Sequence, residues 1–174
     1  MWGLTLEPAL DRTDLLAEPV TEAIRGRGDG TFQVAEIDPE LADTVAFCER
    51  YEVPLGASAN CVIVAAKRGG AVRFAACVVL ATTRADVNGV VRRHLDARKA
   101  SFAPQDQAVA ETGMEYGGIT PFGLPADWPV LVDQAVVEQP HVVVGSGVRR
   151  SKLVVPGQSL SKLTQSEVIE GLAR

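Results

Sequence analysis

Histidine and cysteine, the side chains that most often hold transition metals, are scarce in this sequence. The 174 residues include two histidines and three cysteines. His94 and His141 have no second ligand at helical spacing, and Cys48, Cys61 and Cys77 form no C-x-x-C pair. We therefore expect neither a metal nor a cofactor. Because three cysteines cannot all pair with one another, a cytoplasmic, reducing setting is the simplest expectation.

Long apolar runs are also lacking. No stretch approaches the roughly 20 apolar residues of a membrane-spanning helix, so we expect no membrane association. The N-terminus carries Glu7, Asp11 and Asp14 and no basic cluster, which argues against a secretory signal. A hydrophobic content of 47% and a mean hydropathy of +0.11 indicate a folded globule. The length predicts one domain over residues 1–174, of which residues 1–28 form a helical N-terminal extension.

Basic residues are few in the first third of the chain. Residues 1–66 hold four Lys or Arg against twelve Asp or Glu, whereas residues 67–174 hold thirteen against ten. The basic residues of the second part concentrate in Lys67, Arg68, Arg73, Arg84, Arg92, Arg93, Arg98 and Lys99. Binding of phosphate depends on local charge, so the net charge of −5 does not exclude it. On charge alone, the stretch is more typical of a solvated helix with flanking loops.

Helical and strand-like patterns are interspersed along the chain. Asp38-Pro39 is a favourable helix start, and that helix should end before Pro54. Further helices are predicted over residues 86–95 and 104–111. Strands are predicted over residues 31–37, 61–66, 72–80, 130–132, 142–144 and 153–155, with residues 67–70 as a hairpin turn. These elements predict a mixed α/β domain around one sheet.

The segment whose backbone conformation is most constrained by its sequence comprises residues 112–125 and is called the glycine loop below. It reads Thr112-Gly113-Met114-Glu115-Tyr116-Gly117-Gly118-Ile119-Thr120-Pro121-Phe122-Gly123-Leu124-Pro125. Glycine permits backbone conformations that other residues avoid, and proline fixes φ. Such a loop has a defined shape and can bring backbone N–H groups close to a ligand. We place the active site here; the alternative interpretation is an ordinary Gly-Pro turn that joins a helix to a strand.

Part of this loop also resembles a known family. The segment from Gly117 to Leu124 resembles the signature loop of the YbaK/prolyl-tRNA synthetase-associated family, whose editing domains deacylate mischarged tRNA. Residues 129–133, 141–147 and 152–160 resemble later segments of that family in the same order, and the resemblance covers about residues 38–174. It implies a curved, mostly antiparallel sheet approaching a barrel, with surrounding helices and a substrate pocket at one end.

The resemblance also implies the residues of the site. Catalysis in that family relies on the loop and on the ribose hydroxyl of the substrate more than on a side-chain nucleophile. The catalytic positions carried over are Gly117, Gly118, Ile119, Thr120 and Pro121. The expected substrate-binding residues are Asn60, Cys61, Lys99, Thr112, Tyr116, Phe122, Asp133, Gly145, Ser146 and Gly147. Arg84, Arg92, Arg93 and Arg98 are expected to contact tRNA.

The implied activity is hydrolysis of the ester of a mischarged tRNA by a deacylase acting in trans. Such esters are activated, so positioning of the carbonyl and of a water, with stabilisation of the oxyanion by backbone N–H groups, could supply much of the catalysis. Alanyl- or cysteinyl-tRNA specific for proline is the substrate that the resemblance suggests, bound by its acceptor end, and an aminoacyl-tRNA synthetase is a candidate partner. The alternatives are a non-catalytic binding module of the same fold, which would recognise an end group or a protein partner, and a hydrolase of small esters.

The sequence departs from the family at one position. Many members carry a lysine at the start of the first central strand, where it helps to bind the terminal phosphate and ribose. Asn60 stands at that position here, and an asparagine supplies no charge. Lys99 or Arg84 could replace the missing cation. Otherwise the protein binds a different end group or has lost its activity.

Other sites are weaker interpretations of the same residues. Cys61 has no histidine near it in sequence, and a cysteine in a Val-rich strand is usually part of the core. Asp133, His141 and Ser146 have the side-chain types of a hydrolase triad, but Ser146 does not lie in a G-x-S-x-G elbow. The glycines around Ser146 lack the third glycine and the lysine of nucleotide-binding loops.

Overall fold

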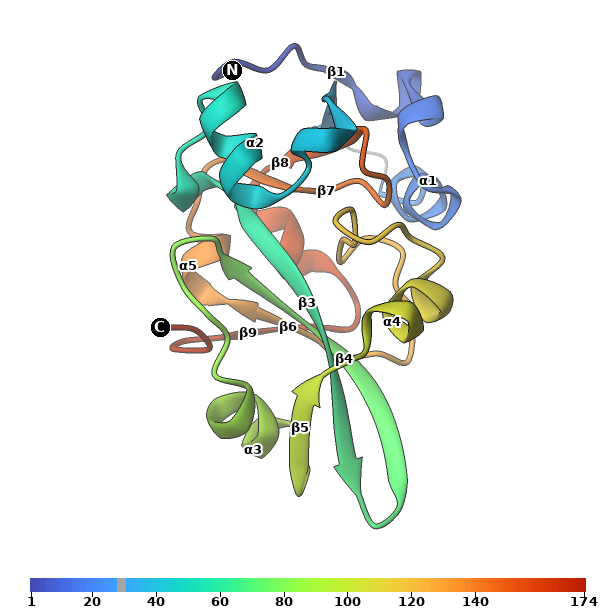
Figure 1. The fold of residues 1–174 in the computed structure, drawn as a ribbon, viewed down its shortest axis with the longest axis vertical. Helices are drawn as coiled ribbons and strands as arrows, with labels where there is room; N and C mark the ends of the chain where they lie inside the picture. The colour runs from blue at the N-terminus through green and yellow to red at the C-terminus, as the bar shows by residue number, and fades with distance from the viewer. Residues whose placement is uncertain (28–30) are drawn as a thin grey trace.

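The computed structural model describes residues 1–27 and 31–174 and contains two open sheets (Figure 1). The first sheet has the strand order β1-β2-β8-β7, and the second has the order β5-β3-β4-β6-β9. The strands are β1 (Glu7–Pro8), β2 (Gln33–Glu36), β3 (Ala59–Arg68), β4 (Ala71–Leu80), β5 (Lys99–Phe102), β6 (Val130–Asp133), β7 (Val142–Gly145), β8 (Ser151–Val155) and β9 (Ser166–Ile169). A parallel bridge between Ser58 and Val143 links the two sheets. The mixed α/β class and the mostly antiparallel pairing are confirmed, but the strands form two open sheets, not one sheet and not a closed barrel.

The helices surround these sheets. They are α1 (Glu18–Arg25), α2 (Thr44–Tyr51), α3 (Arg92–His94), α4 (Gln105–Thr112) and α5 (Gln134–Val137). In Figure 1, α1 and α2 flank the first sheet, whereas α3 and α4 lie beside the second. Among the described residues, no helix has the length and apolar character that crossing a bilayer requires.

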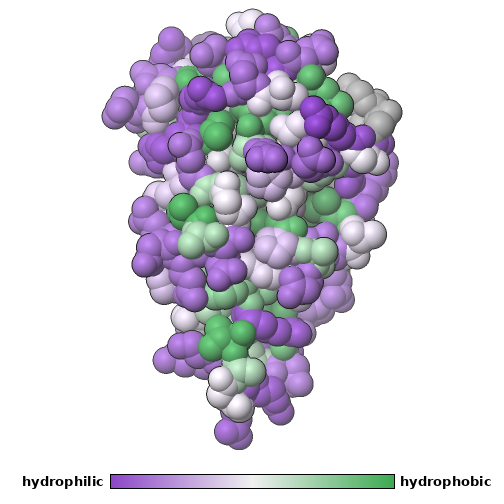
Figure 2. Space-filling model, turned by 90° about the vertical axis from the view of Figure 1, so that its right-hand side faces the viewer, coloured by the Kyte–Doolittle hydropathy of each residue, from purple (hydrophilic) through white to green (hydrophobic). Residues whose placement is uncertain are grey.

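The hairpin of β3 and β4 is the longest paired element and was predicted from its Val/Ala-rich runs. Its ten-residue strands pair from Ala59 opposite Leu80 to Arg68 opposite Ala71. Gly69 and Gly70 form the turn with φ values of 57° and 82°, as a tight hairpin of right-handed twist requires. The turn forms the narrow lower end of the molecule, where apolar and hydrophilic side chains alternate on the surface (Figure 2).

The neighbouring strand β5 covers part of β3. Its four residues pair with Val64–Lys67, with Phe102 opposite Val64 and Lys99 opposite Lys67. The first half of β3, residues 59–63, extends past this ladder toward α2. Side chains and backbone there can therefore face a cavity instead of another strand. Neither β5 nor β9 nor the short helix α5 was predicted from the sequence pattern.

Residues 1–27 differ from the predicted helical extension. Two short 3₁₀ turns and a two-residue strand precede α1, and β1 pairs with β2. Leu15, Val20 and Ile24 are buried, so this segment packs onto the rest of the fold. Its helical part is restricted to α1, where Pro19 occupies a favourable place in the first turn. Part of the break predicted at residues 26–30 lies outside the described residues.

Two predicted helices are irregular. The helix expected from Asp38 to Pro54 is a 3₁₀ turn, Pro39–Leu41, followed after Ala42 and Asp43 by α2. The helix expected over residues 86–95 begins as a π-helical turn, Val87–Val91, and continues as α3. The Asp86 side chain accepts hydrogen bonds from backbone N–H groups of this turn. The break between the 3₁₀ turn and α2 proves to be part of the candidate site.

Candidate active site

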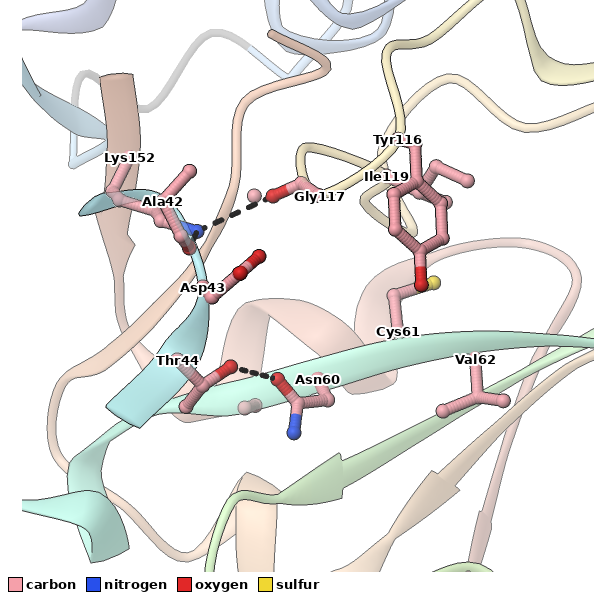
Figure 3. Close-up of a pocket in the computed structure, with 12 residues that line it drawn as sticks. Ala42, Asp43, Thr44, Asn60, Cys61, Val62, Tyr116, Gly117, Ile119 and Lys152 are labelled. Atoms are coloured by element: carbon pink, nitrogen blue, oxygen red, sulfur yellow. Dashed lines mark hydrogen bonds between the residues drawn. The ribbon is translucent and has the colours of Figure 1, made fainter. Parts of the chain in front are cut away.

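A cavity of about 290 Å³ lies where the glycine loop faces the first half of β3 (Figure 3). Four segments that are distant in sequence form its wall: the break before α2, the start of β3, the glycine loop and the ends of β7 and β8. The lining residues are Ala42, Asp43, Thr44, Ala59, Asn60, Cys61, Val62, Tyr116, Gly117, Ile119, Gly145 and Lys152. The structure thus brings together Asn60, Cys61, Tyr116, Gly117, Ile119 and Gly145 from the predicted set.

The glycine loop is held in place by the turn between β7 and β8. Gly147 N–H donates to Gly118 O at 2.7 Å, and Glu115 N–H donates to Gly147 O at 2.9 Å. A Cβ on Gly118 would lie 2.7 Å from Val148 O, and one on Gly145 would lie 2.4 Å from Gly118 O. Glycine is required at both positions because two backbone segments approach each other here.

The aromatic end of the loop anchors it in the core. Phe122 is fully buried and packs edge-to-face against Phe32, with ring centroids 4.9 Å apart. A Cβ on Gly123 would lie 2.5 Å from Pro19 O, so this part of the loop packs directly on α1. The loop is therefore fixed at both ends, and its middle residues face the cavity.

The backbone N–H groups of the loop differ in their availability. Gly118 N–H donates to Glu115 O at 2.9 Å, within a turn. In residues 1–27 and 31–174, no protein atom accepts a hydrogen bond from the N–H of Gly117 or of Ile119. Both of these residues line the cavity. Gly117 and Ile119 are consequently better placed than Gly118 to donate to a bound oxygen atom.

Two basic side chains join the loop to the segment before α2. Arg149 donates to Tyr116 O and to Pro39 O, each at 3.1 Å. Lys152 Nζ donates to Ala42 O at 3.0 Å and to Gly117 O at 3.5 Å. The break in the predicted helix is what brings the Ala42 carbonyl to Lys152. Both bonds of Lys152 are drawn in Figure 3.

Lys152 is the main functional candidate that the sequence pattern did not reveal. It is the second residue of β8 and has a relative exposure of 8%, and its Nζ is 5.4 Å from the centroid of the Phe47 ring. Burial, with a smaller contribution from Arg149, lowers the pKa of Lys152 from 10.5 to about 8, although Asp43 and Cys48 oppose the shift. A lysine within an apolar strand segment was the available signal. A cation therefore reaches the cavity from β8, whereas β3 contributes Asn60.

Asn60 and Asp43 supply polar groups opposite Lys152. Asn60 Oδ1 accepts a hydrogen bond of 2.8 Å from Thr44 Oγ1, the hydroxyl of the first residue of α2. The Asp43 side chain lies between Lys152 and Asn60 in Figure 3 and is 3.9 Å from Arg149 Nη1. The cavity thus presents a cation, a carboxylate and an amide within one small volume.

Several predicted substrate-binding residues lie outside the cavity and have structural contacts. Thr112 is buried and donates to Ala108 O at 2.7 Å. Ser146 is buried and 2.6 Å from Ser151 Oγ, while Gly147 packs on Ala17. Asp133 is buried at the junction of β6 and α5, and burial raises the pKa of its carboxyl. The predicted set therefore includes residues of the cavity wall and residues behind it, which the sequence pattern did not distinguish.

Two residues of the predicted catalytic set are also buried behind the wall. Thr120 is fully buried, and within the described residues its Oγ1 has no hydrogen-bond partner. Pro121 is buried beside it. Neither residue lines the cavity. Their placement suggests that they shape the loop, while Gly117 and Ile119 form its exposed inner face.

The cations expected to replace the missing lysine of β3 are not at the cavity. Lys99 pairs with Lys67 on the ladder, seven residues along β3 from Asn60, which corresponds to roughly 23 Å. Arg84 is exposed and forms backbone hydrogen bonds with Arg174. Arg92, Arg93 and Arg98 share a separate surface cavity with Arg68. This second region, called the basic end below, consists of Lys67, Arg68, Arg92, Arg93, Arg98 and Lys99.

The alternative catalytic sites have little support from the geometry. Burial raises the pKa of the Cys61 thiol, which disfavours the nucleophilic thiolate at neutral pH. His141 is exposed, while His94 Nε2 contacts Glu167 at 2.8 Å and not the other members of a triad. Among the described residues, no three His, Cys, Asp or Glu side chains are grouped to hold a metal ion.

Comparison with known proteins points to one family. Residues 38–163 match the model of the aminoacyl-tRNA editing domain. A candidate trans-editing enzyme for prolyl-tRNA synthetase has a similar crystal structure, with a TM-score of 0.75 and 21% identity over 88% of this chain and 94% of that one. A hypothetical protein has a TM-score of 0.79 and 21% identity, over 90% and 100% of the two chains. A candidate signal-transduction protein from Marinobacter aquaeolei has a TM-score of 0.58 and 17% identity, over 89% of this chain and 30% of its own. No curated protein matches the sequence.

Proposed function

Because this chain belongs to the aminoacyl-tRNA editing domain family, we propose that it is a deacylase acting in trans on mischarged tRNA. Its substrate is an aminoacyl ester on the terminal ribose, with alanine or cysteine on tRNA specific for proline as the candidate pair. A cavity of about 290 Å³ that holds both the amino acid and part of the ribose favours a small side chain. An aminoacyl-tRNA synthetase is the candidate partner that would release this substrate.

The observation that carries the proposal is the cavity itself. Its lining includes Gly117 and Ile119, whose N–H groups lack protein partners within the described residues, and the buried Lys152. Fixed donors around a small cavity are the arrangement that stabilises negative charge on a carbonyl oxygen. Lys152 fixes the Gly117 carbonyl and thereby the orientation of the loop, and its charge adds to the positive potential on this side.

The reaction needs few side chains. Water attacks the ester carbonyl carbon, and the carbonyl oxygen becomes an oxyanion that accepts hydrogen bonds from Gly117 and Ile119 N–H. The neighbouring ribose hydroxyl of the substrate orients the water. The bond between the carbonyl carbon and the ribose oxygen then breaks, and that oxygen takes up the proton that the water releases. Free amino acid and uncharged tRNA result, without a covalent enzyme intermediate.

The basic end is the proposed contact for the acceptor stem. Arg92, Arg93 and Arg98 would bind phosphates there, while the 3′ end reaches the cavity. Arg84 joins them in the proposal as an exposed cation at the other side of the π-helical turn. Contacts of this kind position the substrate without reading its sequence, so discrimination of the amino acid stays with the cavity.

The first test is release of amino acid from a panel of mischarged tRNAs, headed by alanyl- and cysteinyl-tRNA specific for proline. Wild type should release one amino acid rapidly, and Gly117→Ala should lose at least tenfold in rate. The added Cβ would lie 2.4 Å from Arg149 Nη1, so the Arg149 side chain must move away from Tyr116 O.

Gly171→Ala is the matched control for this variant. Gly171 has φ +75°, close to the +85° of Gly117, but a Cβ added at Gly171 would have no other atom within 4 Å. Both substitutions carry the strain of positive φ, so only a local effect separates their activities. Gly118→Ala is a poor test, because its Cβ would strike the backbone of Val148 and displace the whole loop. A folded wild type that releases nothing from any tRNA would overturn the proposal in favour of a binding module.

A further inference from the structure

A second cavity adjoins the candidate active site on the side of β5. Its volume is about 280 Å³, and it shares Cys61, Val62, Tyr116 and Ile119 with the first. The remaining lining residues are Ile63, Phe102, Ala103, Gln105 and Ala108. The shared lining residues place the two cavities side by side along the first half of β3. A ligand in the first cavity that extends past the exposed Tyr116 would reach the second.

Two exposed aromatic side chains mark this second cavity. Phe102 has a relative exposure of 63% and Tyr116 of 52%, and the other large apolar side chains exposed in the described residues are not aromatic. A single exposed aromatic ring needs no explanation. Here both exposed rings line the same cavity, one from the end of β5 and the other from the glycine loop. Each is accessible to a planar group that enters from solvent.

The position of Phe102 agrees with an extended ligand. Phe102 is opposite Val64, four residues along β3 from Asn60, which corresponds to roughly 13 Å. At the other end of β5, its first residue, Lys99, is exposed beside Arg98 and Lys67. A path from the active site thus meets first Tyr116, then Phe102 and then the positive charges of the basic end. Aromatic stacking faces combined with nearby cations are typical of surfaces for single-stranded nucleic acid.

From the adjacency of the cavities and the two exposed rings we propose that the second cavity binds the unpaired nucleotides that precede the terminal one at the 3′ end of tRNA, with Phe102 and Tyr116 as stacking platforms. The inference rests on the proposed function and adds a nucleotide subsite to it. Bases of an unpaired strand stack on aromatic side chains whatever their identity, so one subsite suits every tRNA. Gln105 at the start of α4 is the polar side chain available to a base edge.

The test is the affinity of a short single-stranded RNA that ends in CCA and carries a fluorophore at its 5′ end. Phe102→Ala should weaken its binding about tenfold, as the loss of one stacked base predicts. Phe102→Trp should restore the affinity, whereas Phe102→Leu should not, because leucine keeps apolar area but offers no ring face. Leu10→Ala, at a side chain of 43% exposure away from both cavities, is the control and should bind as wild type does.

Kinetics with charged tRNA give an independent readout. Phe102→Ala should raise KM about tenfold and leave kcat close to that of wild type, because the ring lies beyond the reacting ester. Unchanged RNA affinity and unchanged KM in Phe102→Ala would overturn the subsite even if the enzyme deacylates normally. Conversely, the protein could hydrolyse no charged tRNA and still bind RNA in a way that depends on the ring at position 102. That result would support the subsite and contradict the proposed function.

Discussion

The candidate active site and the basic end illustrate two ways of placing functional groups. The glycine loop is locked by Phe122 in the core, by Gly147 on the neighbouring turn and by Lys152 on β8. By contrast, Arg93, Arg98 and Lys99 are exposed on the lower part of the fold. An ester carbonyl must be held to a fraction of an ångström, whereas phosphates can be bound by mobile charges. The burial of the first region and the exposure of the second correspond to the tasks we propose for them.

Substitution of Lys152 is the strongest test of the contrast between the candidate active site and the basic end. Lys152→Met removes the charge and both hydrogen bonds while keeping an unbranched side chain of similar length. We expect a loss of about 100-fold in kcat/KM for deacylation, the size of effect expected when loss of a positioning contact misplaces the reacting groups by about 1 Å. Lys162→Met, the same change at an exposed lysine outside the cavity, should retain full activity. Activity of Lys152→Met equal to wild type would show that the candidate active site does not depend on this cation.

The buried charge should also be visible in stability. The pKa of Lys152 is about 8 in the folded protein and 10.5 for an ordinary lysine, so the unfolded state binds more protons between these values. The free energy of unfolding should therefore rise across that window, by about 2 kcal/mol from Lys152 alone. Urea unfolding near pH 7 and near pH 10 measures the rise, and the difference between wild type and Lys152→Met isolates it. An identical pH dependence in both proteins would argue against a lowered pKa.

The basic end should respond to charge and not to shape. Reversal of two charges in Arg92→Glu with Arg93→Glu should weaken tRNA binding about tenfold at low salt. It should also reduce the slope of log K against log salt by roughly 1.5, as the loss of two phosphate contacts predicts. Arg25→Glu with Arg50→Glu makes the same charge change in the acidic first third and serves as control. Equal effects of the two double substitutions would indicate that tRNA binding responds to the overall charge of the protein and not to a local contact.

The smallest effect is expected from substitution of Thr120, which tests whether this residue takes part in catalysis or only supports the loop. Its buried hydroxyl lacks a partner within the described residues, so Thr120→Val should raise the free energy of unfolding by about 1 kcal/mol. Deacylation should not change if the residue only shapes the loop. Chemical denaturation and the charged-tRNA assay measure the two quantities. A stable but inactive variant would instead return Thr120 to the catalytic set that the resemblance implied.

Local sequence patterns predicted several elements well. The Val/Ala-rich runs around Lys67-Arg68-Gly69-Gly70 indicated the hairpin, because short apolar runs and a paired-glycine turn act over few residues. The helix expected before Gly113 also forms, and Gly113 ends it with φ 68°. The prediction of one long helix after Asp38 was wrong, because the chain breaks at Ala42 and Asp43, where backbone and carboxylate face Lys152 and Arg149. Tertiary contacts there override local helix propensity.

The sequence by itself determined the mixed α/β class, the hairpin and the glycine loop, because glycine, proline and short apolar runs constrain the backbone near themselves. The tertiary structure decided which residues face the cavity. Lys152 meets Ala42 across 110 residues of chain, and β5 ends at Phe102 in register with Val64. Such contacts depend on how the two sheets meet and on where one strand stops along another, and no local pattern encodes that geometry. The buried cation and the second cavity were consequently visible only in the folded chain.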